Sequence, residues 1–91
     1  MSDVICKDLE IKNIKGLHAR AAAAFVKTVE AYDAVIEVER LGQKVNGTSI
    51  MGLMMLAASK GTFIKVYSSG KQSKEALDAL CQLIENKFGE E

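Results

Sequence analysis

The first third of the chain changes from an alternating to a helical pattern of apolar positions. Apolar and polar residues alternate, with one interruption, over residues 5–12, and Leu9 and Ile11 fall on the same side. This spacing is typical of a strand with one buried face. From Ala19 to about Tyr32, apolar positions 22, 25, 26 and 29 recur at helical spacing, and Asp33 is the expected end of that helix.

The middle of the chain predicts a hairpin and a second helix. β-Branched residues alternate from Val35 to Glu39, a turn follows at residues 41–43, and a short second strand covers residues 44–46. Ser49 is a good N-cap for the helix that follows, and Gly61 is expected to end it. The apolar stripe of this helix comprises Leu53, Leu56 and Ala57.

The last third of the chain adds a strand and a helix. Residues alternate from Thr62 onward. Ser73 is the expected cap of the last helix and Gly89 its expected stop. The apolar stripe of this helix comprises Ala76, Leu77, Leu80, Leu83 and Ile84. The order β-α-β-β-α-β-α predicts an α+β fold, with one mostly antiparallel four-stranded sheet and three helices packed on one face. Residues 1–91 contain no linker or repeat, so we expect a single domain.

The composition narrows the class of protein. Apolar residues make up 48% of the chain and charged residues 26%, which fits a globular rather than a disordered chain. Twelve basic and twelve acidic side chains cancel, and no basic cluster indicates nucleic acid. No apolar run reaches the roughly 18 residues that span a bilayer. The N-terminal sequence MSDVICKDLE lacks the pattern of a secretory signal, so we expect no membrane insertion and a cytoplasmic location.

The two cysteines do not indicate a metal site. Cys6 and Cys81 lie far apart and form no C-x-x-C motif. The sequence alone leaves a disulfide open, but in a cytosolic chain we expect free thiols that pack as small apolar groups. One histidine and two cysteines without a close pair do not favour zinc. We therefore expect no metal and no other cofactor.

The stretch GLHARAAAAF, residues 16–25, begins a helix without the usual Ser, Thr, Asp or Asn cap. It contains His18, the single histidine of the chain. An uncapped helix start has free amides and a partial positive charge, and it binds phosphate well. A phosphoryl group on the ring would meet the backbone N–H groups of Ala19 and Arg20. The Arg20 guanidinium can also bind phosphoryl oxygens.

The simpler interpretation is that His18 is a surface residue or a substitute for a cap. Gly16 favours a functional site somewhat, because glycine lets the chain turn closely into the helix. Ala21 and Ala24 fall opposite the core stripe, so we expect them to be exposed and to leave room for a docking partner beside His18.

The second helix has more apolar residues than one buried stripe needs. Ile50, Met51, Met54 and Met55 either fill gaps in the core or form an exposed surface, and the sequence leaves both possibilities open. Ser49 is first a helix cap. A phosphate on it would also lie at a helix start, and its charge could hinder the docking of an acidic partner.

Together, GLHARAAAAF and VNGTSIMGLMMLAASKG resemble the HPr family, the histidine phosphocarriers of the bacterial phosphoenolpyruvate-dependent phosphotransferase system. The resemblance covers nearly the whole chain. It implies an open-faced β-sandwich with sheet order 1-4-2-3. It also implies that Enzyme I phosphorylates His18 on its δ nitrogen, that Arg20 stabilises the phosphoryl group, and that a IIA-type protein receives it. Ser49 matches the serine that an HPr kinase/phosphorylase modifies in many bacteria.

The resemblance also implies a partner-binding surface on a monomeric carrier that is not itself a turnover catalyst. The residues we expect on this surface are Leu17, Ala21, Ala24, Lys27, Ile50, Met51 and Met54. The chain departs from the family at Ala21, where many members have proline, and this residue bears on site geometry and partner choice. Both a sugar-transport and a nitrogen-regulatory role remain open.

Two other functions compete with this interpretation. A purely regulatory relative, controlled through Ser49, would act by binding alone and would not need His18. An unrelated module that binds a metabolite at a helix end would need several convergent polar groups, and the sequence offers only His18 and Arg20.

Overall fold

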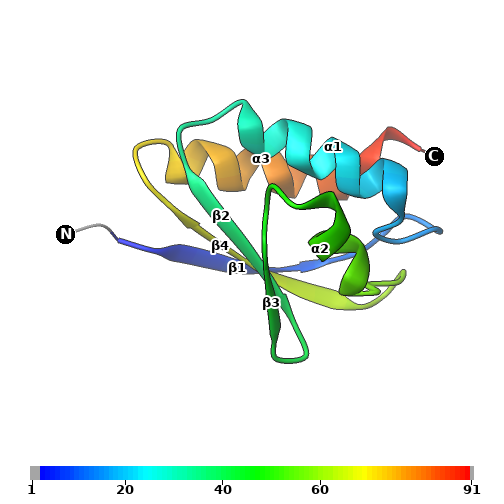
Figure 1. The fold of residues 1–91 in the computed structure, drawn as a ribbon. Coiled ribbons are helices and arrows are strands. Elements are labelled where there is room, and N and C mark those ends of the chain that lie inside the picture. The colour runs from blue at the N-terminus through cyan, green and yellow to red at the C-terminus, as the bar shows by residue number, and fades with distance from the viewer. Residues whose placement is uncertain (1–2, 91) are drawn as a thin grey trace.

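A computed structural model describes residues 3–90 of the chain. Its elements follow the predicted order (Figure 1). They are β1 (Ile5–Glu10), α1 (Ala19–Glu30), β2 (Val35–Arg40), β3 (Gln43–Asn46), α2 (Ile50–Met55), β4 (Phe63–Ser69), α3 (Ser73–Glu85) and a short 3₁₀ turn, η1 (Lys87–Gly89). No helix within these residues is long and apolar enough to cross a membrane.

The four strands form one antiparallel sheet in the order β1-β4-β2-β3, as expected. The register pairs buried residues with one another. Leu9 of β1 lies opposite Ile64 of β4, and Val66 of β4 lies opposite Val38 of β2. Because side chains alternate across a strand, this register places the apolar residues of the central strands on one face of the sheet.

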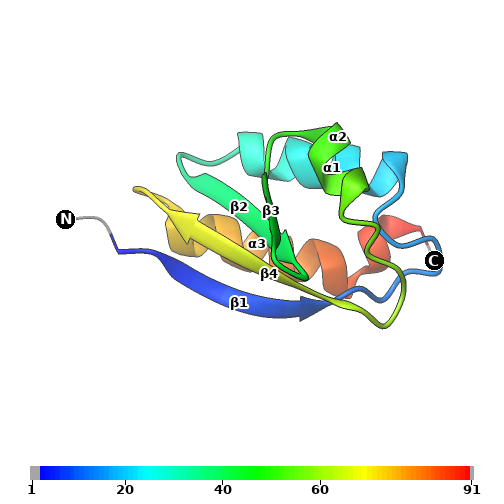
Figure 2. The same ribbon diagram turned by 60° about the horizontal axis from the view of Figure 1, so that its bottom comes forward.

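The helices lie on that face and leave the other face open (Figures 1 and 2). α1 and α3 pack side by side over the sheet, and α2 packs against α1 and β3. Phe25, Leu53 and Leu80, one from each helix, are fully buried together with Ile36 and Val66 of the sheet. The residues that the helical periodicity assigned to the core side of α1 are buried, and so are those assigned in α3, except for the partly buried Leu83.

The second helix is shorter than expected. It ends at Met55 rather than near Gly61, because the backbone turns left-handed at Ala57 (φ 52°). Ala57 is therefore exposed instead of joining the apolar stripe, and Ala58 is buried in its place. Leu53 and Leu56 are buried as predicted. The early end brings Ala58 into contact with the loop before α1, which a local pattern cannot show.

Other helix boundaries differ by a few residues. α1 ends at Glu30 rather than at about Tyr32. Ser73 is the first residue of α3 and Gln72 is its cap position, and the helix ends at Glu85 ahead of Gly89. Cys6 and Cys81 are both free thiols, as expected, but only Cys81 packs against the core, whereas Cys6 is exposed on β1.

Candidate functional site

His18 occupies the N-cap position of α1 with an extended backbone (φ −79°, ψ −178°) and makes no capping hydrogen bond with its side chain. Its carbonyl accepts the first helical hydrogen bond, from the Ala22 N–H at 2.8 Å. The first turn contains no acidic side chain. The uncapped helix start that the sequence predicted is therefore present, with the positive end of the helix dipole directly after His18.

The loop that leads into α1 is held against the segment after α2. The Leu17 N–H donates to the Ala58 carbonyl at 2.9 Å. Gly16 has a left-handed backbone (φ 65°), and a Cβ atom there would lie 2.3 Å from the same carbonyl oxygen. Only glycine fits this combination of backbone angle and close approach. Gly16 therefore sets the position from which His18 enters the helix.

Two residues that the sequence analysis did not identify contact the histidine loop. The Nε2 atom of His18 lies 2.5 Å from Oε2 of Glu90, near the other end of the chain. The other carboxylate oxygen, Oε1, accepts a hydrogen bond at 3.0 Å from the amide nitrogen of Asn13, which also donates to the Gly16 carbonyl at 2.9 Å. Asn13 is fully buried. No sequence signal links these residues, because they lie more than seventy positions apart.

The groups around Glu90 stabilise the negative charge of its carboxylate. Burial raises the pKa of its carboxyl, but the hydrogen bonds from Asn13 and His18 and the positive charges of His18 and Lys15 outweigh that effect. The net result is a pKa below the ordinary value of 4.5, so Glu90 is ionised near neutral pH. A carboxylate therefore faces the imidazole.

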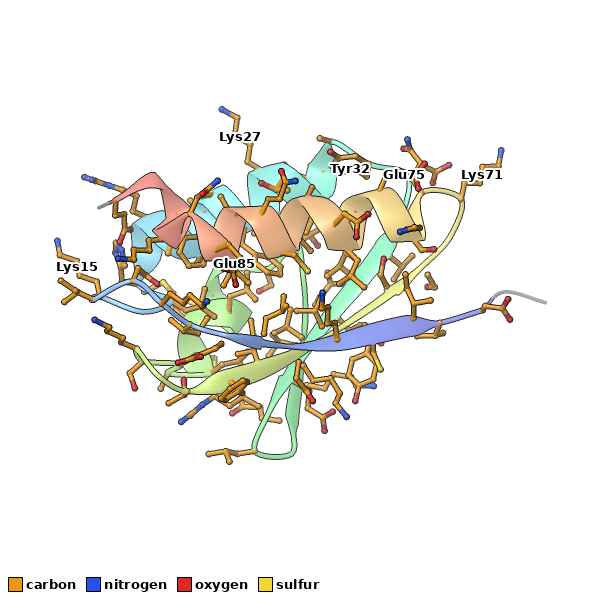
Figure 3. All side chains as sticks on the ribbon, turned by 180° about the vertical axis from the view of Figure 1, so that it is seen from behind. Lys15, Lys27, Tyr32, Lys71, Glu75 and Glu85 are labelled. Carbon is orange, nitrogen blue, oxygen red and sulfur yellow. The ribbon has the colours of Figure 1, made fainter. Side chains whose placement is uncertain are left out.

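A hollow of about 340 Å³ opens beside this contact. It is lined by Ile14, Lys15, His18, Arg20, Phe88, Gly89 and Glu90. Figure 3 shows Lys15 at the end of the molecule where α1 starts and the chain ends. The structure thus brings together His18 and Arg20, as predicted, and adds a second cation. An anion that enters this hollow would meet two basic side chains and a helix start.

The structure corrects part of the predicted docking surface. Ala21 is fully buried and Leu17 is only 4% exposed, so the expectation that these two residues lie on an exposed docking surface is wrong. Ala24 is half-buried, and Lys27 is exposed and points away from the sheet (Figure 3). Four consecutive alanines give no polarity contrast from which to choose a face, which explains the error.

The second helix presents an apolar surface. Ile50, Met51, Met54 and Met55 are between 41% and 73% exposed, so they do not fill the core. We call these four residues the α2 apolar surface. At the start of the helix, the Ser49 hydroxyl accepts a hydrogen bond from the Gly52 N–H at 2.9 Å, as predicted for a cap. Ser49 therefore lies directly before the α2 apolar surface.

The chain resembles known proteins over almost its full length. The family model described as PTS HPr component phosphorylation site matches residues 5–86. A phosphocarrier protein HPr from Neisseria meningitidis is 46% identical over 84 residues, which cover 92% of this chain and 94% of the relative. One from Pseudomonas aeruginosa is 48% identical, with 91% and 93% covered.

The fold comparison agrees with the sequence comparison. The crystal structure of HPr-C-His from Thermoanaerobacter tengcongensis superimposes with a TM-score of 0.91 and 48% sequence identity, and it covers 96% of this chain and 98% of that one. The fold matches over almost the whole chain, and the sequence pattern of the family matches from β1 to the end of α3. The chain belongs to the HPr family of phosphocarrier proteins of the phosphotransferase system.

Proposed function

We propose that this protein accepts a phosphoryl group from phosphorylated Enzyme I on the Nδ1 atom of His18 and passes it to a IIA-type protein. It acts as a carrier that other proteins phosphorylate and dephosphorylate, not as a turnover catalyst. The observation that carries the proposal is the uncapped start of α1 with His18 at its N-cap position and Arg20 in its first turn.

The geometry suits a phosphoryl group that is held reversibly. The first amides of α1, including those of Ala19 and Arg20, have no partner within the helix and are available to phosphoryl oxygens. Arg20 is exposed and lines the same hollow as His18, so its guanidinium can add a charge-assisted hydrogen bond. Such a site stabilises the phosphoryl group moderately and lets it leave again.

The α2 apolar surface supports the proposal that partners bind next to the site. Adaptable methionine side chains suit recognition of more than one protein. Enzyme I and the IIA-type protein would bind this surface in turn, with Lys27 and Ala24 on the adjoining part of α1. Since α2 packs against α1, one partner can cover both elements. We also propose that the carrier works in the cytoplasm.

Ser49 is the proposed regulatory residue. We propose that an HPr kinase/phosphorylase modifies it. A phosphate at this position would lie at the start of α2, where the helix tolerates negative charge, and directly before the α2 apolar surface. The added charge would weaken docking without unfolding the helix. The output of this carrier is sugar transport or nitrogen-type regulation.

A direct phosphorylation assay tests the main proposal. The protein is incubated with Enzyme I and labelled phosphoenolpyruvate, and the label is expected to be acid-labile and alkali-stable, as for phosphohistidine. The His18→Ala variant should remain unlabelled while it unfolds like the unsubstituted protein. Label that persists in His18→Ala would overturn the proposal.

The Ser49 proposal needs a separate measurement. Ser49→Asp should slow the labelling of His18 by Enzyme I, and Ser69→Asp, at the end of β4 that lies far from the start of α1 (Figure 1), should not. Equal rates for the two variants would exclude regulation through charge at Ser49.

A further inference from the structure

The last residues that the structure describes form part of the histidine site. After α3 the chain turns through Lys87, Phe88 and Gly89, all with left-handed backbones (φ 55°, 55° and 75°). Such angles are uncommon for lysine and phenylalanine. This turn reverses the chain so that Glu90 contacts the loop before α1, and Figure 1 shows the C-terminus beside the start of that helix.

Each carboxylate oxygen of Glu90 has a defined partner at the histidine loop. The Glu90 side chain is only 13% exposed and uses both carboxylate oxygens, one on His18 Nε2 and the other on the buried amide of Asn13. Asn13 lies between two acceptors, Glu90 and the Gly16 carbonyl, so only its amide nitrogen can face them. The carboxylate is therefore held in one orientation by a group that is itself held by the backbone.

We propose that Glu90 is a positioning residue for His18: its carboxylate accepts a hydrogen bond from the Nε2–H group and leaves Nδ1 as the nitrogen that receives the phosphoryl group. A neutral imidazole carries one proton, and an acceptor at Nε2 selects the form in which Nδ1 has a lone pair. Within the described residues no hydrogen bond engages Nδ1. The inference rests on the proposed function and deepens it.

The same contact assists the transfer step. The Nδ1 lone pair forms the new bond to phosphorus while the bond to the donor breaks and its electron pair stays with the donor. The ring, which keeps its Nε2 proton, then becomes positively charged. A carboxylate that holds this proton stabilises the charge, as in other sites where a carboxylate orients a histidine. Lys15 and Arg20 line the same hollow as the ring, and without the Glu90 carboxylate their positive charges would disfavour a positive charge on the imidazole.

The test compares Glu90→Gln with Glu75→Gln in the whole chain. Glutamine keeps the shape of the side chain and removes its charge. Glu75 lies exposed in the first turn of α3, at the far end of the molecule from Lys15 (Figure 3). We expect Glu90→Gln to lower the rate constant for phosphorylation by Enzyme I about tenfold, the effect of losing one partly exposed charge-assisted hydrogen bond, with little change in KM.

A spectroscopic readout separates positioning from folding. In the ¹⁵N spectrum of the His18 ring near pH 8, the unsubstituted protein and Glu75→Gln should show the Nε2-protonated form. Glu90→Gln should show both forms in exchange. An unchanged ring spectrum, or a transfer rate equal to that of Glu75→Gln, would overturn the proposal. Failure of the unsubstituted protein to be phosphorylated would instead refute the proposed function, since the ring spectrum requires no phosphoryl donor.

Discussion

Removing the Ser49 hydroxyl is expected to destabilise the protein through α2. This helix has six residues, contributes one buried side chain, Leu53, and contains Gly52, which costs about 1 kcal/mol relative to alanine. A helix this short is not stable by itself. The hydrogen bond from the Gly52 N–H to the Ser49 hydroxyl is its one side-chain cap, and losing such a cap costs about 1 kcal/mol.

Thermal and urea unfolding of Ser49→Ala measure this cost. For a chain of this size, about 1 kcal/mol corresponds to a fall in Tm of about 4–8 °C. Ser59→Ala is the matched control, because it removes an exposed hydroxyl just after α2 that makes no hydrogen bond within the described residues. If Ser49→Ala and Ser59→Ala unfold at the same midpoint, the cap does not stabilise the fold as argued.

Ser49→Asp separates stability from docking. Aspartate caps a helix as well as serine does, and its charge favours a helix start by about 0.3–1 kcal/mol. This variant should therefore unfold at or above the midpoint of the unsubstituted protein. A slower phosphorylation of His18 in Ser49→Asp would then arise from charge beside the α2 apolar surface and not from a weakened helix.

Three further predictions follow from individual contacts. Gly16→Ala should destabilise the fold by about 1–3 kcal/mol, and urea unfolding should show a larger loss of stability for it than for Gly42→Ala. Both glycines have left-handed backbones, but only a side chain at Gly16 would meet a carbonyl oxygen. Phe25→Ala should lower the free energy of unfolding by about 3–5 kcal/mol, because Phe25 is fully buried. Phe63 is 58% exposed, so Phe63→Ala should lower it by less than about 1 kcal/mol; similar values for the two variants would contradict the assigned core. The hydrogen bond to Glu39, with burial and the Glu39 charge, raises the pKa of Tyr67 from 10.0 to about 12. Since the folded state binds this proton more tightly than the unfolded state does, the contribution of Tyr67 to stability is complete below about pH 10 and is lost as the pH rises through about 12. Ultraviolet titration of Tyr32→Phe should show this high pKa, and a second substitution, Glu39→Gln, should lower it.

The sequence predicted those features that depend on neighbouring residues. Alternation and helical spacing identified the strands and the buried sides of α1 and α3, and the absence of a capping residue before Ala19 identified the open helix start. Ser49 was likewise predictable, because capping involves residues three positions apart. The strand order came from the family resemblance, since periodicity alone does not determine which strands pair.

The sequence could not predict features that depend on distant contacts. The left-handed turn at Ala57 follows from the packing of Ala58 against the loop of Leu17, and no local signal favours it at an alanine. Ala21 lies in a run of identical residues, where no pattern separates a buried from an exposed position. Glu90 reaches His18 only because α3 returns the chain across the sheet and the turn after it reverses direction.

The pairing of β1 with β4 has a consequence for the time course of folding. In this register Glu10 pairs with Phe63 and Ile5 with Ser68, and β1 is the edge strand of the sheet. Such a pairing requires the closure of a long loop, which is slow compared with formation of the local hairpin of β2 and β3. During synthesis β1 has no partner in the sheet until the ribosome has released β4. We therefore expect β1 to be among the last strands to join the sheet, although it is synthesised before the other three.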